Sequence, residues 1–315
     1  MKRVVMLLLA CPVMIANCLA ANLCDEPGWQ TKKYDPVKTL PKLLGDYKNL
    51  PDYIDAMKAV HARFTGTPRT LAMFGASQTS SKTFWIPLQN GGTNMSAQMQ
   101  KDFALVKGYM KPECWNWKGG SHGNSGGMLA KWVNETACVD VLKKLNPEVV
   151  IILIGQSDMD QHLKAANVQE AFEGWKATLT EACQKCLSNG TVVILCTFTP
   201  RASRRMDVYN EAILQIAATL KTPVIDWGGE CIKRSPNDWN GAELREEYKD
   251  KIYEVPRLLC ADGQHASYPS KYAGDWSEES LSKSGDNLRS YLTLTVYADV
   301  LRQVFGVQDP APARK

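Results

Sequence analysis

Three residues in two distant segments have the side chains that nucleophilic catalysis uses. Ser77 follows the apolar run 70–74 after a short turn, and Asp262 and His265 lie near the other end of the chain. A serine hydroxyl is a weak nucleophile until a base takes its proton, and imidazole is a natural base because it ordinarily titrates near neutral pH. A nearby carboxylate can orient the ring and stabilise the imidazolium. The sequence therefore predicts Ser77 as nucleophile, His265 as general acid and base, and Asp262 as its orienting partner.

Glycines beside these residues indicate where the negative charge of such a reaction would be held. Gly75 permits a sharp turn, from which the Ser77 hydroxyl could reach a substrate. The backbone N–H groups of Ser77 and Gly126 are expected to point at a carbonyl oxygen as it becomes an oxyanion, because glycine at 126 leaves the approach open. The predicted reaction is hydrolysis of an oxygen ester through an acyl-enzyme.

Four blocks of sequence resemble the SGNH hydrolases, the GDSL-like lipases and esterases, in order and spacing. They are Phe74-Gly75-Ala76-Ser77-Gln78-Thr79, Gly123-Asn124-Ser125-Gly126, Ile154-Gly155-Gln156-Ser157-Asp158 and Asp262-Gly263-Gln264-His265. Thr199-Pro200-Arg201 and Tyr209-Asn210-Glu211-Ala212 also resemble the family, so the likeness runs from Leu71 to Phe305. The resemblance implies an oxyanion hole formed by Ser77, Gly126 and Ser157, no metal or organic cofactor, and a three-layer αβα sandwich with a central parallel, flavodoxin-like sheet.

Two positions depart from the family's pattern. The acidic residue that precedes the nucleophile in the family is Ala76 here, and the oxyanion asparagine is replaced by Ser157. A hydroxyl is a shorter donor than an amide, and losing one oxyanion donor costs about 3 kcal/mol of transition-state stabilisation, a hundredfold or more in rate. Two interpretations follow: a slow ester hydrolase, or a protein that keeps the pocket and binds a carbohydrate or another ligand without catalysis.

Other interpretations of single residues stay open. Ser77 also has the position of a helix N-cap. Ser125 lies in a Gly-x-Ser-x-Gly segment that matches the nucleophile elbow of the α/β-hydrolases, although polar residues rather than an apolar strand precede it. A metal cluster is a further alternative, yet acids that open a helix are commonly caps, and we expect no metal site. Its candidate ligands are Asp158, Asp160 and His162.

Two groups of side chains are candidates for substrate contacts. Three arginines after the third apolar run either bind an anionic group or form a solvated basic face. Five aromatic residues in the second half of the chain either stack on a sugar ring or pack in the core. These residues are Arg201, Arg204 and Arg205, and Trp227, Trp239, Tyr268, Tyr272 and Trp276.

The pattern of apolar residues predicts the elements that position this chemistry. Short runs bounded by turn residues predict buried strands at 70–74, 149–154, 192–198 and 224–227. Helical periodicity occurs at 52–64, 129–145, 168–187, 206–220 and 288–305. This alternation predicts a parallel sheet with right-handed crossovers, covered by helices on both faces. Ligands of such sheets bind beyond the C-terminal strand ends, where Ser77 and Ser157 would lie.

The chain divides into four predicted segments. Residues 1–20 have the charged start, short apolar run and small-residue exit of a signal peptide, with a lipoprotein signal ending before Cys11 as the alternative. The apolar run is too short to span a membrane. An N-terminal extension then covers 21–69, the hydrolase-like domain 70–307, and a disordered tail 308–315. The loops at 228–261 and 267–284 are expected to flank the substrate site.

Composition and cysteines narrow the location and the partners. Without the leader the chain has 35 basic and 33 acidic residues, a balance too even to indicate a nucleic-acid partner. Eight cysteines would remain, so up to four disulfides are predicted for a secreted or periplasmic protein. Cys183 and Cys186 have redox spacing but not the helix-N-terminal position that stabilises a thiolate. The expected partner is a small-molecule or glycan ester, with an acetylated carbohydrate as first choice.

Overall fold

The computed structural model describes residues 24, 28–46, 53–201 and 204–310. The predicted signal peptide, residues 1–20, lies outside these ranges, as do the last five residues of the predicted tail. Residues 308–310, which begin that tail, are exposed. Within the described ranges, no helix has the length and apolar character needed to cross a bilayer. The division into extension, domain and tail stays a prediction.

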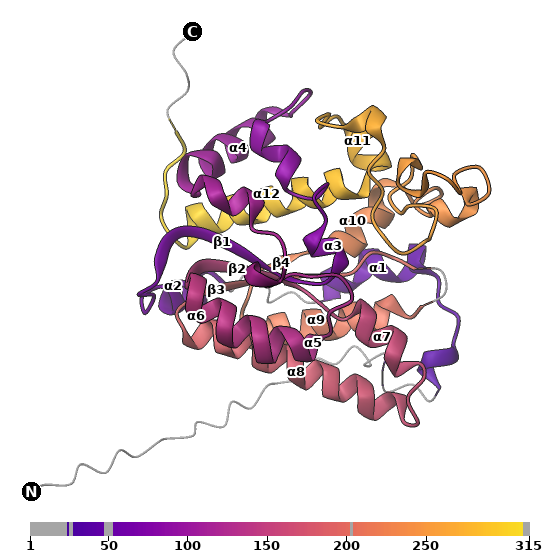
Figure 1. Cartoon of the computed structure of the whole chain (residues 1–315), viewed down its shortest axis with the longest axis horizontal. Helices are drawn as coiled ribbons and strands as arrows, with labels where there is room; N and C mark the ends of the chain where they lie inside the picture. The colour runs from indigo at the N-terminus through magenta and orange to yellow at the C-terminus, as the bar shows by residue number, and fades with distance from the viewer. Residues whose placement is uncertain (1–23, 25–27, 47–52, 202–203, 311–315) are drawn as a thin grey trace, which may run out of the picture.

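A four-stranded parallel sheet forms the centre of the fold (Figure 1). Its strands, hydrogen-bonded in sequence order, are β1 (Thr67–Gly75), β2 (Pro147–Leu153), β3 (Val192–Cys196) and β4 (Val224–Ile225). Every residue of β2 and β3 is buried, which is why these strands appear in the sequence as continuous apolar runs. The predicted parallel sheet is confirmed. β2, β3 and β4 end one or two residues earlier than predicted, and β1 ends one residue later. β4 is short because Trp227 already begins a helix.

A short segment at Asn124 pairs with β1 and completes the sheet order. The N–H of Gly75 donates to the carbonyl of Gly123 at 3.0 Å, and the N–H of Ser125 donates to the carbonyl of Gly75 at 3.1 Å. The bridge lies on the side of β1 opposite β2, so the spatial order is the Asn124 segment, β1, β2, β3 and β4. This is the flavodoxin-like order, whose switch point lies between β1 and β2.

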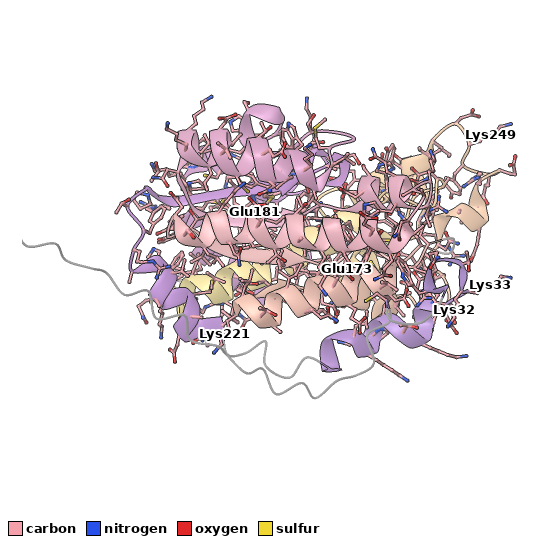
Figure 2. The ribbon with its side chains drawn as sticks, turned by 90° about the horizontal axis from the view of Figure 1, so that it is seen from below. Lys32, Lys33, Glu173, Glu181, Lys221 and Lys249 are labelled. Atoms are coloured by element: carbon pink, nitrogen blue, oxygen red, sulfur yellow. The ribbon has the colours of Figure 1, made fainter. Side chains whose placement is uncertain are left out.

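Helices cover both faces of the sheet and give the predicted three layers (Figure 1). One layer contains α4 (Ala97–Tyr109), α10 (Trp227–Arg234) and α12 (Gly285–Gln303). The other contains a continuous helix of α5 (Ala130–Trp132), a π-helical stretch (Val133–Val141) and α6 (Leu142–Leu145), then α8 (Val168–Ser188) and α9 (Met206–Leu220). Figure 2 shows this second layer from below, with Glu173 and Glu181 on the exposed side of α8. Phe172 and Trp175 are buried on its other side, as in an amphipathic helix.

The shorter helices complete the connections. They are α1 (Pro36–Asp46), α2 (Tyr53–His61), α3 (Ser77–Ser80), α7 (Gln156–His162) and α11 (Glu278–Lys283). The predicted helices at 129–145, 168–187 and 206–220 are confirmed to within one residue, whereas α12 begins three residues before its predicted start. The predicted loops at 228–261 and 267–284 are partly wrong, because α10 and α11 occupy parts of them.

Helix α4 was not predicted from the sequence, and its packing gives the reason. Its buried face contains Asp102, whose Oδ1 lies 2.7 Å from Nη2 of Arg302 on α12. A buried acid interrupts the apolar spacing that marks a helix, but its ion pair allows the burial. Ser96 caps the start by accepting from the N–H of Met99 at 3.1 Å.

The predicted disulfides are not seen among the described residues. The seven cysteines from Cys114 to Cys260 are buried thiols, and no disulfide joins any two of them. The sulfur atoms of Cys138 and Cys186 lie 3.7 Å apart between the π-helical stretch and α8, too far for a disulfide bond. Burial raises the pKa of the Cys183 thiol, opposite to the shift that a redox cysteine needs.

Candidate active site

Ser77 lies at the turn where β1 ends. It is the first residue of α3, two positions after Gly75. A Cβ on Gly75 would stand 2.4 Å from the carbonyl oxygen of Leu153 in β2 and 2.5 Å from Oγ1 of Thr79. Only glycine lets the chain turn this close to the neighbouring strand. Ser77 is therefore placed at the switch point of the sheet, where ligands of such folds bind.

Asp262 and His265 form one compact turn in the long connection between α10 and α11. Oδ1 of Asp262 accepts from the N–H groups of Gln264 at 2.7 Å and His265 at 2.9 Å, and Oδ2 lies 2.6 Å from Nδ1 of His265. Burial opposes the charge of Asp262, but hydrogen bonds from His265, from the Cys260 thiol and from the backbone hold its pKa well below the usual range. The carboxylate therefore accepts a hydrogen bond from the protonated Nδ1 and fixes the orientation of the ring.

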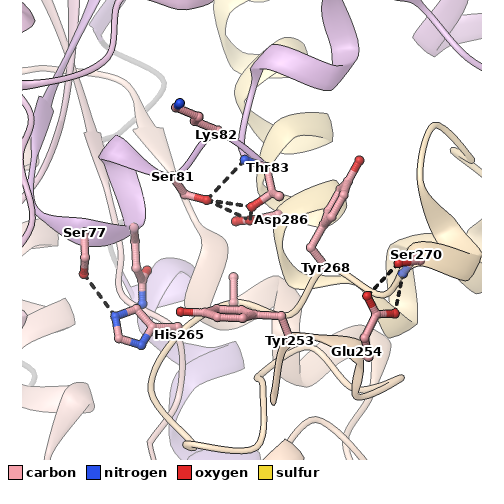
Figure 3. Close-up of a pocket in the computed structure, with 12 residues that line it drawn as sticks. Ser77, Ser81, Lys82, Thr83, Tyr253, Glu254, His265, Tyr268, Ser270 and Asp286 are labelled. Carbon is pink, nitrogen blue, oxygen red and sulfur yellow. Dashed lines mark hydrogen bonds between the residues drawn. The ribbon is translucent and has the colours of Figure 1, made fainter. Parts of the chain in front are cut away.

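The structure brings the predicted nucleophile and base together. Nε2 of His265 lies 3.1 Å from Oγ of Ser77 (Figure 3). With the proton of the neutral ring on Nδ1, Nε2 has a free lone pair directed at the hydroxyl. The series Ser77, His265, Asp262 thus has the geometry of a catalytic triad.

Three side chains that the sequence analysis missed support the turn at Ser77. Nε2 of Gln78 donates to the backbone carbonyl of Gln264 at 2.9 Å. Nη1 of Arg289 donates to the carbonyl of Gln78 at 2.7 Å, and Nζ of Lys118 donates to the carbonyl of Thr79 at 2.7 Å. Burial lowers the pKa of Lys118 to about 7, and the neighbouring Arg289 adds to this shift. No signal in the sequence singled out Arg289, because the predicted helix 288–305 also contains the charged residues Asp299 and Arg302.

The three residues assigned to the oxyanion hole lie at the ends of neighbouring segments. The N–H of Ser77 is free for a substrate, since no acceptor for it is found in the described part of the chain. Gly126 is exposed two residues past the bridge at Asn124, and a Cβ there would meet open space. Ser157 is the half-buried second residue of α7, just past the end of β2. The oxyanion assignment of Gly126 and Ser157 stays a prediction.

The rival nucleophile Ser125 has a different environment. Its N–H is used in the pairing with Gly75, and within the described ranges its hydroxyl has no hydrogen bond to a histidine. The nearest histidine in the chain, His122, places Nδ1 3.0 Å from the carbonyl of Lys118. Ser125 therefore lacks the base that a nucleophilic serine needs.

The candidate metal ligands contact different partners. Both carboxylate oxygens of Asp158 accept from the N–H of Ala130, so this residue caps α5. Asp160 lies 3.0 Å from Nε of Arg204, and Nδ1 of His162 lies 2.6 Å from the Tyr209 hydroxyl. No group of three metal-binding side chains occurs within the residues that the structure describes.

The predicted basic face is wrong for two of its three arginines. Arg205 is buried and forms a two-point ion pair with Asp207, both contacts being 2.8 Å. Arg201 is also buried, with Nη1 3.7 Å from Asp160. Burial beside a carboxylate indicates a structural role for both arginines rather than contact with solvent.

Most of the predicted aromatic residues pack in the core. Trp227 is fully buried, and Trp239, Tyr272 and Trp276 are at most 7% exposed. Only Tyr268 of that group lines the cavity at the candidate site. Tyr253, which the sequence analysis did not select, lines the same cavity and lies beside His265 with ring centroids 6.5 Å apart.

A cavity of about 430 Å³ opens beside Ser77 and His265 (Figure 3). Part of its lining is polar, and the two tyrosines also line it. The polar residues of the lining include Ser81, Lys82, Thr83 and Asp286, and Glu254 and Ser270 lie farther from Ser77 in Figure 3. Gly126 and Ser157 are not among the residues that line it.

The comparisons with known proteins find similarity only to solved structures. No family model matches the chain, and no curated protein matches it. The acetylxylan esterase Axe2 from Geobacillus stearothermophilus is 17% identical over 76% of this chain and 95% of its own, with a TM-score of 0.40. A candidate GDSL-like lipase from Parabacteroides merdae is 15% identical over 78% of this chain and 99% of its own, with a TM-score of 0.40. Any assignment of activity therefore rests on the site itself.

Proposed function

We propose that this chain is a serine ester hydrolase of the SGNH type, with Ser77 as nucleophile. The observation that supports it is the unbroken series of contacts from Ser77 Oγ to His265 Nε2 at 3.1 Å and from His265 Nδ1 to Asp262 at 2.6 Å. The series opens onto a cavity of a size that admits a small ester.

The reaction follows from the positions of these groups. Ser77 Oγ attacks the carbonyl carbon of the ester while its proton passes to Nε2 of His265, and Asp262 stabilises the resulting imidazolium. The imidazolium then gives the proton to the leaving alcohol, and the acyl group stays on Ser77. Water attacks the acyl-enzyme with His265 again as base, which releases the acid and restores the hydroxyl.

The negative charge of the tetrahedral intermediate requires donors at the carbonyl oxygen. The free N–H of Ser77 is one such donor, and we assign the N–H of Gly126 and the hydroxyl of Ser157 as the others. With a serine at 157 the stabilisation is weaker than with an amide, so we expect a low turnover. Export through the predicted signal peptide, to the periplasm or the outside of the cell, is part of the same proposal.

A fluorophosphonate probe tests the assignment. It reacts with an activated serine, so mass spectrometry of the digested wild-type protein is expected to find the adduct on Ser77. The Ser77→Ala variant is expected to lose both the adduct and hydrolysis of p-nitrophenyl acetate, while Ser125→Ala keeps both. An adduct on Ser125, or a wild-type protein that neither reacts nor hydrolyses the ester, overturns the proposal; the second result favours a ligand-binding protein without catalysis.

A further inference from the structure

Asp286 lines the same cavity as Ser77 and His265, beside Ser81 and Thr83 (Figure 3). It belongs to the first turn of α12 and is 3% exposed. Its Oδ2 accepts from Oγ1 of Thr83 at 2.5 Å and from Oγ of Ser81 at 3.4 Å. Its backbone N–H donates to the carbonyl of Ser267 at 3.1 Å, which fixes the residue in place.

The second carboxylate oxygen of Asp286 has no partner in the described part of the chain. No hydrogen bond or ion pair reaches Oδ1, although the residue lines the cavity. Oδ1 is not among the fully buried side-chain atoms that lack a partner, so it is accessible from the cavity that Asp286 lines. A ligand that donates a hydrogen bond there would supply the donor that the described residues do not.

The charges around Asp286 select the kind of donor. Arg289 and Lys118 face the carboxylate from the protein side, and both act to keep it ionised against the burial that raises its pKa to about 6. Lys82 lines the same cavity and is exposed. An ammonium group on the ligand would be repelled by these three cations, and an ionised acid would be repelled by Asp286 and has no hydrogen to donate to it. A neutral hydroxyl is the donor that fits.

The walls of the cavity favour a ring that has an apolar face of C–H groups and polar groups at its edge. Tyr253 and Tyr268 are held next to each other by a backbone hydrogen bond of 2.9 Å from the N–H of Tyr268 to the carbonyl of Tyr253. Aromatic faces contact the C–H groups of such a ring, while the hydroxyls of Ser81 and Thr83 lie beside its edge.

We propose that this cavity binds the alcohol part of the ester as a neutral, sugar-type ring, and that Asp286 Oδ1 accepts a hydrogen bond from one of its hydroxyl groups. The inference rests on the ester hydrolysis proposed above. It makes Asp286 a specificity residue, which acts on the choice of alcohol rather than on the bond-breaking step.

Three acetate esters test it on the wild-type protein. A monoacetylated methyl glucoside supplies ring hydroxyls, cyclohexyl acetate has a ring of the same size without them, and p-nitrophenyl acetate reports the triad. We expect kcat/KM for the glucoside to exceed that for cyclohexyl acetate by about tenfold to a hundredfold, the range of a hydrogen bond to a charged group. Equal values for these two esters overturn the inference. Hydrolysis of none of the three overturns the proposed function as well.

Asp286→Asn tests the residue, because the exchange keeps the shape and removes the charge. We expect the preference for the glucoside over cyclohexyl acetate to fall at least tenfold. Asp299→Asn, the same exchange on the same helix but at a residue bonded to Tyr53, is the matched control and keeps the wild-type preference. Reaction with the fluorophosphonate probe shows that each variant is folded. A folded Asp286→Asn that retains the full preference overturns the role of Asp286.

Discussion

The side chain of Gln78 donates to the backbone carbonyl of Gln264 at 2.9 Å, and so connects the residue after Ser77 to the residue before His265. Gln78 is 4% exposed, and its Oε1 has no partner among the described residues. One buried amide therefore joins the two loops that must stay aligned for proton transfer. Its effect on catalysis is one of position, because it contacts neither the hydroxyl of Ser77 nor the ring of His265.

Gln78→Met removes this hydrogen bond while filling the same space. We expect kcat on p-nitrophenyl acetate to fall about threefold to tenfold with little change in KM, because a hydrogen bond of this kind contributes about 0.5–1.5 kcal/mol. Gln264→Ala is the control, since the acceptor is the backbone and the Gln264 side chain is exposed. A wild-type kcat in Gln78→Met contradicts the positioning role.

Arg289→Met tests the support behind the same turn. Arg289 is 1% exposed, donates to the carbonyl of Gln78 and to Oγ1 of Thr79, and lies over the ring of Phe84 at 3.8 Å. Its loss leaves a buried carbonyl without a donor and removes one of the two cations that favour the ionised form of Asp286. We expect the free energy of unfolding to fall by roughly 3–5 kcal/mol, measured by denaturant titration. Arg63→Met, at an exposed position, is expected to change it by less than about 0.5 kcal/mol.

The contrast between Ser77 and Gln78 shows what could be predicted from the sequence. The meeting of Ser77 with His265 was predictable because parallel strands bring their C-terminal ends, and the loops after them, to one edge of the sheet. The bond of Gln78 was not, because its acceptor is a backbone carbonyl that any residue provides. Tyr253 was missed because its place in the cavity depends on the path of a long loop, which leaves no periodic pattern. Asp286 was missed because its place depends on how the start of α12 packs against Ser81 and Thr83.

The fold was predicted where the apolar pattern is unbroken. The strands and α8 and α9 bury continuous or regularly spaced apolar residues, and these were correctly assigned. Helices α4 and α10 were missed because Asp102 is buried in an ion pair and because two glycines follow the start of α10. A Cβ at Gly228 would stand 2.3 Å from the carbonyl of Phe198, so the tight packing there requires glycine rather than a strong helix former.

The buried carboxylate of Asp286 is expected to make the stability of the protein depend on pH. Burial raises its pKa to about 6 in the folded protein, above its value in the unfolded chain, so the folded state binds the proton more tightly. The contribution of this group to stability is therefore present at low pH and is lost as the pH rises through about 6. Asp286→Asn has no such charge. The free energy of unfolding of the variant minus that of the wild type is therefore expected to rise by up to about 3 kcal/mol between pH 4 and pH 7.

Denaturant titrations of both proteins at a series of pH values measure this difference. Asp299→Asn serves as the control, because no buried charge is removed at that half-buried position. A difference between Asp286→Asn and wild type that stays constant with pH, or that changes in the opposite direction, would show that the carboxylate of Asp286 is not held in an unfavourable charged state.

Ser157→Asn tests the oxyanion assignment by restoring the longer amide donor. Ser157 follows the end of β2, next to the strand that carries Ser77, and its hydroxyl forms no hydrogen bond with the residues described here. One oxyanion donor contributes about 3 kcal/mol of transition-state stabilisation, and a hydroxyl that acts through water supplies part of this. We therefore expect Ser157→Asn to raise kcat on p-nitrophenyl acetate about tenfold. Ser188→Asn, at the exposed end of α8, is expected to leave kcat unchanged. An equal or lower kcat in a Ser157→Asn variant that unfolds at the wild-type temperature would mean that position 157 does not face the oxyanion.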